Sequence, residues 1–184
     1  MTDAQQRTVC EAFSRLLSYP RGDVAGPARQ ALEALGPGAS GDALGRFLAH
    51  VGANEPARLE ELYTATFDLQ PACAPYFGHQ LLGDGPARGP LLARLVEVYD
   101  EEGFRPREEL ADHVAEVLGF LAVARPGAAR EDLLRDGLLP AVARMIESFE
   151  EKQHPYRDLL VAVHGALAPA PVEGKGPAPA EARR

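Results

Sequence analysis

Apolar residues recur at intervals of three and four along nearly the whole chain. The segment from Glu108 to Leu121 shows this most clearly, because its apolar residues would share one face of a helix. We find no run of alternating β-branched residues long enough for a strand. The pattern therefore predicts an all-α fold, a single-domain helical bundle of about eight helices. The apolar residues of that segment are Leu110, Val114, Val117, Leu118 and Leu121.

Residues that start and stop helices divide this pattern into segments. Three residues have side chains that can cap the helix following each of them: Thr2, Ser40 and Asn54. Gly137 and Pro140 should bend or split one long helical segment near the C-terminal end. We expect helices over residues 2–19, 24–35, 40–51, 55–67, 76–82, 91–102, 108–121, 128–152 and 155–167.

The composition is that of one globular domain followed by a short tail. Of the 184 residues, 46% are hydrophobic and 25% charged, which is enough to form a core. We expect the domain to span residues 1–168. Residues 169–184 are rich in Ala, Pro and Gly without helical periodicity, and we expect them to be disordered. The formal net charge of −8 disfavours nucleic acid and anionic membranes as partners and favours a basic peptide.

The chain also has the features of a cytoplasmic protein. Its first residues carry no basic and apolar segments of an export signal. No uncharged run reaches the roughly 18–20 residues of a membrane span, so we expect no direct membrane insertion. The two cysteines, Cys10 and Cys73, are expected to be reduced, buried thiols.

Histidine and acidic residues do not fall at the spacings of a metal site. A di-iron bundle needs Glu-x-x-His motifs on two helices. Here Glu109 and His113 are one residue too far apart, and Glu116 follows His113 instead of preceding it. We therefore expect no metal and no cofactor.

Catalytic motifs are missing as well, and we expect no catalytic residues. Asp112 and His113 are adjacent, so on a helix their side chains would diverge by about 100° and form no catalytic dyad. Glu109 and Glu116 are better spaced to pair with His113 and would favour its charged form. The simplest interpretation is a solvated helix face. Residues 83–90 contain glycines and precede a helix, but they lack the lysine and the strand of a phosphate-binding loop.

Two stretches of the chain, residues 63–89 and 91–122, carry a series of short motifs. They are Thr66-Phe67-Asp68-Leu69, Cys73, Tyr76, Leu81–Asp84, Arg88-Gly89, Tyr99, Gly103-Phe104, Glu109-Leu110 and Asp112-His113. In their order and spacing these residues resemble the NarJ branch of the redox-enzyme maturation chaperones. These proteins assemble respiratory nitrate reductase and are related to the TorD and DmsD proteins.

The resemblance implies a non-catalytic cytoplasmic protein, a monomer or weak dimer. It would bind the N-terminal peptide of an apo molybdoenzyme catalytic subunit, here the nitrate reductase alpha subunit, until the molybdenum cofactor is inserted. Asp112 and His113 would then border the peptide groove, outside the core. The alternative is a small all-α metal- or nucleotide-binding enzyme that uses His113 with nearby carboxylates. The expected peptide-binding residues are Tyr63, Phe67, Tyr76, Leu81, Tyr99, Phe104, Glu109, Asp112, His113 and Glu116.

Overall fold

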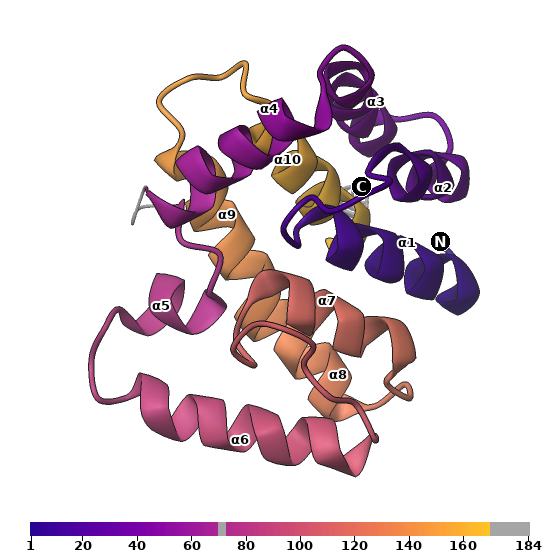
Figure 1. Cartoon of the computed structure of the whole chain (residues 1–184). Helices are drawn as coiled ribbons and strands as arrows, with labels where there is room; N and C mark the ends of the chain where they lie inside the picture. Colours follow the sequence, from indigo (N-terminus) through magenta and orange to yellow (C-terminus); the bar gives the residue numbers. More distant parts are fainter. Residues whose placement is uncertain (70–72, 170–184) are drawn as a thin grey trace, which may run out of the picture.

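The computed structural model describes residues 1–69 and 73–169, and all regular structure in these ranges is helical (Figure 1). The described residues form no strand, and their bridge pairing is limited to Tyr76 and His113. The predicted all-α fold is confirmed. Apart from its first residue, the tail predicted to be disordered lies outside the described residues.

Helices α1 to α4 and α10 form the upper half of the view in Figure 1. Thr2 caps α1 as predicted, because its hydroxyl accepts from the Gln5 backbone while the Gln5 side chain accepts from the Thr2 backbone. The prediction that Ser40 caps the third helix is wrong. Gly38 takes that position, and the Ser40 hydroxyl lies against Gly165 of α10, where a Cβ would be only 2.6 Å away. The bounds are α1 (Asp3–Leu16), α2 (Ala25–Leu35), α3 (Ala39–Gly52) and α10 (Pro155–Leu167).

Helix α4 (Pro56–Tyr63) continues directly into a π-helical turn, η1 (Thr64–Asp68). The prediction that Asn54 caps this helix is wrong: Glu55 precedes it, and the Asn54 side chain donates to the His50 carbonyl, 2.8 Å away, at the end of α3. Aromatic rings fix α4 and η1 on α10. Ring centroids lie 5.8 Å apart for Tyr63 and Tyr156 and 4.9 Å apart for Phe67 and Tyr156, both edge to face.

Helices α5 to α8 lie in the lower half of Figure 1, and α9 runs from there up towards α10. The long C-terminal segment is helical from residue 128 to residue 148, but Gly137 lies in a π-helical turn and Pro140 in the first turn of the next α-helix. The predicted interruption is therefore a π turn. The bounds are α5 (Phe77–Leu82), α6 (Arg88–Glu101), α7 (Val114–Val123), α8 (Ala128–Asp132), η3 (Leu133–Leu138) and α9 (Leu139–Ser148).

Helix α7 is the central helix of the bundle and packs along α1. Residues Val114 to Leu121 are all buried, including Glu116. The predicted helix over 108–121 is wrong in its first part, because α7 begins only at Val114 and Leu110 is 52% exposed. Residues 108–113 instead form bends and a turn that lead into α7, and this segment carries Asp112 and His113.

The α1–α7 contact includes one buried polar bond whose removal tests the packing. The Ser14 hydroxyl donates to the Ala115 carbonyl over 2.7 Å. Ser14→Ala should lower the free energy of unfolding by about 1–2 kcal/mol, because it removes the bond between the two central helices. Ser18→Ala is the control, since the Ser18 hydroxyl follows α1 and bonds only to the Ser14 carbonyl of that same helix. Equal urea midpoints for the two variants would contradict a stabilising role for the bond between Ser14 and Ala115.

Candidate functional site

Asp112 has no exposed surface, and Arg88 neutralises it from the first residue of α6. The guanidinium donates from Nε to Oδ2 over 2.9 Å and from Nη2 to Oδ1 over 3.1 Å. This two-point geometry uses both oxygens of the carboxylate. The bond to Asp112 also raises the pKa of Arg88, so the guanidinium keeps its charge at neutral pH.

Backbone and side-chain bonds hold the segment before α7 in place. Phe77 N donates to Asp112 O over 2.8 Å, and Val114 N donates to Pro75 O over 2.7 Å. The Tyr99 hydroxyl donates to the Ala111 carbonyl over 2.8 Å from the buried side of α6. Residues 111–114 are therefore bonded to the start of α5 and to α6 at once.

Gly78 in α5 allows the ion pair to approach this closely. A Cβ at Gly78 would lie 2.6 Å from Asp112 Oδ2 and 2.9 Å from Leu91 Cδ2. Both distances are below van der Waals contact, so any larger residue would displace the carboxylate or Leu91. The small residue in α5 is required by the ion pair behind it.

His113 is also buried, with 1% of its surface exposed. Its Nδ1 accepts from the Ala115 backbone over 3.1 Å, which makes it the N-cap of α7. Burial lowers the pKa of His113 to about 4, so the ring is neutral at physiological pH. The sequence-based placement of Asp112 and His113 outside the core is therefore wrong.

The predicted pairing of His113 with Glu109 and Glu116 is wrong too. Glu109 accepts from the Tyr76 hydroxyl over 2.8 Å, and Glu116 accepts from the Glu108 backbone over 3.3 Å. With His113 in the core, burial favours the neutral ring, contrary to the expected charged form. The reason is that residues 108–113 are not helical, so the helical spacings on which the prediction rested do not apply.

Tyr76 connects the buried pair to the surface. The Arg88 guanidinium lies 5.1 Å from the centre of its ring, and the His113 ring meets it edge to face at 5.0 Å. Its hydroxyl bonds to Glu109, which is exposed. Burial and Glu109 raise the pKa of Tyr76, so the hydroxyl keeps its proton and donates. An unbroken chain of contacts thus runs from Asp112 in the core to Glu109 in solvent.

A shallow apolar hollow of about 440 Å³ lies on α4 and η1. Leu69 is 72% exposed and Tyr19 36% exposed at its edges, and the Tyr19 ring stands edge to face on Tyr63 at 5.5 Å. The pKa of Tyr63 is raised by burial and then by Glu109 and Asp68, so both carboxylates act on the Tyr63 hydroxyl. The hollow is lined by Tyr19, Ala57, Glu60, Glu61, Thr64, Ala65 and Leu69.

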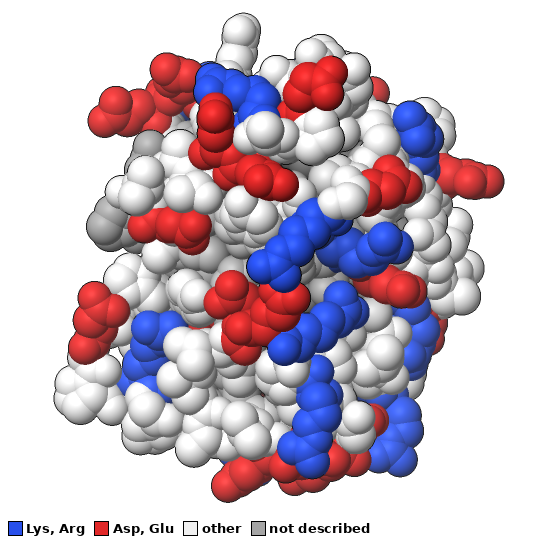
Figure 2. Space-filling model, viewed as in Figure 1, with Lys and Arg blue, Asp and Glu red and all other residues white. Residues whose placement is uncertain are grey.

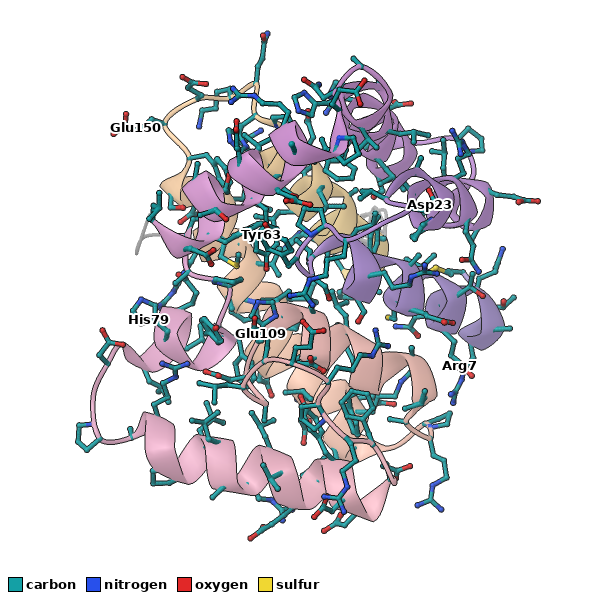
Figure 3. The ribbon with its side chains drawn as sticks, viewed as in Figure 1. Arg7, Asp23, Tyr63, His79, Glu109 and Glu150 are labelled. Carbon is teal, nitrogen blue, oxygen red and sulfur yellow. The ribbon has the colours of Figure 1, made fainter. Side chains whose placement is uncertain are left out.

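Acidic and basic side chains meet at this hollow. Glu60 and Glu61 line it, Arg58 pairs with Glu61 at 2.9 Å, and the Arg21 guanidinium lies 5.5 Å from the centre of the Tyr19 ring. Figure 3 shows Tyr63 and Glu109 in the middle of the same view, between the upper and lower halves. Figure 2 shows Asp and Glu side chains gathered in the middle of this view, with basic side chains beside them. We call the hollow and its surroundings the acidic face, defined by Tyr19, Glu60, Glu61, Asp68, Leu69 and Glu109.

The structure separates the residues predicted to line one groove. Tyr63, Phe67, Tyr99 and Phe104 are all less than 9% exposed and belong to the core. Leu81 lines a different apolar hollow, of about 520 Å³, between α5, α6 and η3. Of the ten residues predicted to bind the peptide, only two have exposed surface at the acidic face: Tyr76, which is half-buried, and Glu109, which is exposed.

Sequence reasoning missed Arg88, Tyr19 and Leu69 as site residues. Arg88 and Leu69 belong to stretches that resemble the chaperone family, but no rule of spacing connects Arg88 to Asp112, 24 residues away. Tyr19 lies just beyond the apolar face of the first helix, and its exposure depends on the neighbouring α4.

The described ranges contain no group of three or more His, Cys, Asp or Glu side chains arranged to hold a metal ion. In the same ranges, no helix is both long enough and apolar enough to cross a bilayer.

Comparison with known proteins gives two matches. The family model "Nitrate reductase delta subunit" matches residues 31–162. The chain is also 30% identical over 173 residues to a probable nitrate reductase molybdenum cofactor assembly chaperone, NarJ, from Bacillus subtilis (strain 168). That alignment covers 91% of this chain and 92% of the relative.

The close approach at Gly78 predicts a large effect of one added methyl group. Gly78→Ala should lower the free energy of unfolding by roughly 1–3 kcal/mol, because the methyl group overlaps Asp112 and Leu91. Gly45→Ala in α3 is the matched control, since a Cβ there meets no atom within 4 Å and should stabilise the helix by about 0.5–1 kcal/mol. Urea denaturation measures both, and a neutral Gly78→Ala would refute the described packing.

Burial of neutral His113 predicts a loss of stability in mild acid. The folded protein holds the pKa of His113 at about 4, below the ordinary 6.5, so the unfolded chain binds more protons between these values. Stability is complete well above pH 6.5 and falls as the pH is lowered towards 4, by about 2 kcal/mol between pH 7.5 and 5.

The control for this titration is His113→Asn, which can still cap α7 but does not titrate. Unfolding free energies at pH 7.5, 6.5 and 5 should fall more steeply for the wild type than for the variant. Parallel curves would show that His113 is not the group responsible.

Proposed function

Because the chain belongs to the nitrate reductase delta subunit family, we propose that it is an assembly chaperone of respiratory nitrate reductase. It binds the N-terminal peptide of the apo alpha subunit in the cytoplasm while the molybdenum cofactor is inserted, before the enzyme docks on its membrane partner. It acts by binding and not by catalysis. The cofactor belongs to the client enzyme.

The acidic face is the observation that carries the proposed binding site. It places the exposed side chains of Tyr19 and Leu69 beside carboxylates, over a hollow of about 440 Å³. An amphipathic helical peptide with basic flanks matches both features, since its apolar side fills the hollow and its charges meet the carboxylates. The net charge of −8 also favours such a peptide.

The predicted groove residues keep different roles in this proposal. Tyr63 and Phe67 do not touch the peptide, because both are buried, and Tyr63 supports the Tyr19 ring at the edge of the hollow. Tyr76 and Glu109 border the bound peptide. Tyr99 and Phe104 pack edge to face at 5.1 Å, and their burial leaves them to support α6 and α7.

The enzyme alternative has less support from the residues it would use. His113 is buried, and its Nδ1 already accepts the Ala115 N–H. Asp112 is bound on both oxygens by Arg88. Asp112 and His113 expose at most 1% of their surface, so neither is open to a substrate in solution.

Leu69→Ser provides the test of this binding site. The variant should weaken binding of a synthetic peptide of the alpha-subunit N-terminus by roughly tenfold, because it removes an apolar anchor. The melting temperature should change little, since Leu69 is 72% exposed in the free protein.

The matched control is Val123→Ser, at the end of α7 and 55% exposed. Isothermal titration calorimetry should give it wild-type affinity. Equal affinities for the wild type and both variants would place the peptide elsewhere on the protein.

A further inference from the structure

We infer that Glu109 selects a basic side chain of the client peptide, and that Tyr76 and Arg88 are positioning residues that hold its carboxylate ready. The inference rests on the proposed function and adds to it the residue that decides specificity. It is carried by four connected contacts between α5, α6 and the segment before α7.

Glu109 differs from the neighbouring carboxylates in its partner. Glu108 pairs with Arg21 at 2.9 Å. Within the described residues, no Lys, Arg or His lies within ion-pair distance of Glu109, whose recorded partner is the neutral Tyr76 hydroxyl on Oε2. A hydrogen bond to a neutral group orients the carboxylate and leaves its charge uncompensated. An incoming cation therefore meets an oriented, unpaired negative charge.

The orientation comes from the ring of Tyr76, which is held from two directions. The Arg88 guanidinium lies over the ring at 5.1 Å, and the His113 ring contacts it edge to face with planes at 81°. Neither neighbour can move easily, because Arg88 is bonded at two points to buried Asp112 and His113 caps α7. The hydroxyl is thus fixed from the core outward.

Among the charged groups in the chain of contacts from Asp112 to Glu109, the Glu109 carboxylate is the one that can act on a ligand. Arg88 and Asp112 neutralise each other, so the buried pair contributes little net field at the surface. Holding the Glu109 side chain before binding reduces the entropy lost when a peptide cation pairs with it.

Calorimetry with the synthetic alpha-subunit N-terminal peptide tests the role of Glu109. Glu109→Gln should weaken binding about tenfold and reduce the dependence of affinity on salt. Glu108→Gln is the matched control, because Glu108 is adjacent, exposed and already paired with Arg21; it should bind within about twofold of wild type.

Tyr76→Phe tests the positioning role while keeping the ring between Arg88 and His113. Losing the hydroxyl should weaken binding about three- to tenfold with little change in melting temperature. In the double variant with Glu109→Gln, affinity should match that of Glu109→Gln alone, because the hydroxyl acts through the carboxylate. Additive losses would overturn the positioning role.

A charge exchange distinguishes recognition from a structural effect. Glu109→Lys should abolish most binding, and a peptide in which one basic residue is replaced by Glu should restore it. Peptides altered at the other basic positions should not. If no single exchange restores binding, or if Glu109→Gln binds like wild type, Glu109 is not the selecting residue.

Failure of the proposed function gives a different result. A wild-type protein that does not bind the peptide at all overturns the function and this inference together. Normal binding that is lost in Leu69→Ser but unaffected in Glu109→Gln leaves the function standing and overturns this inference alone.

Discussion

A carboxylate with no exposed surface is stable in a protein only if its charge and both its oxygens are satisfied, and Arg88 does this for Asp112. Arg88 is the first residue of α6, and Asp112 lies in the non-helical segment just before α7. Removing either partner would leave a buried or half-buried charge alone, which costs roughly 3–5 kcal/mol. Gly78 and Leu91 are packed around the pair, so α5 is fixed by the same contact.

This buried contact also determines what the surface offers a partner. Arg88 lies over the ring of Tyr76, and Tyr76 orients Glu109. The sequence predicted that Asp112 and His113 would lie at a binding surface. They are buried instead, and they hold in place the residues that do reach solvent. His113 adds to the same arrangement, since it caps α7 and supports the other edge of the Tyr76 ring.

The helical fold could be predicted from the sequence because helix periodicity and caps are local. Thr2 caps α1, as expected. The segment before α7 could not be predicted, because residues 108–113 continue the apolar spacing of a helix. Their backbone bonds instead join them to residues 75–77, more than 30 positions away. The spacing also could not show that Tyr63 and Phe67 pack inward on Tyr156. Periodicity shows which residues share one face of a helix, but it does not show which other helix packs against that face.

The central claim is that the client peptide lies on the acidic face with a basic side chain at Glu109. A crystal structure of the protein bound to the alpha-subunit N-terminal peptide measures this directly. The account predicts a helical peptide over α4 and η1, apolar side chains against Tyr19 and Leu69, and a Lys or Arg nitrogen within hydrogen-bonding distance of Glu109. A peptide seated instead in the hollow between α5, α6 and η3, with Glu109 bonded only to Tyr76, would contradict it.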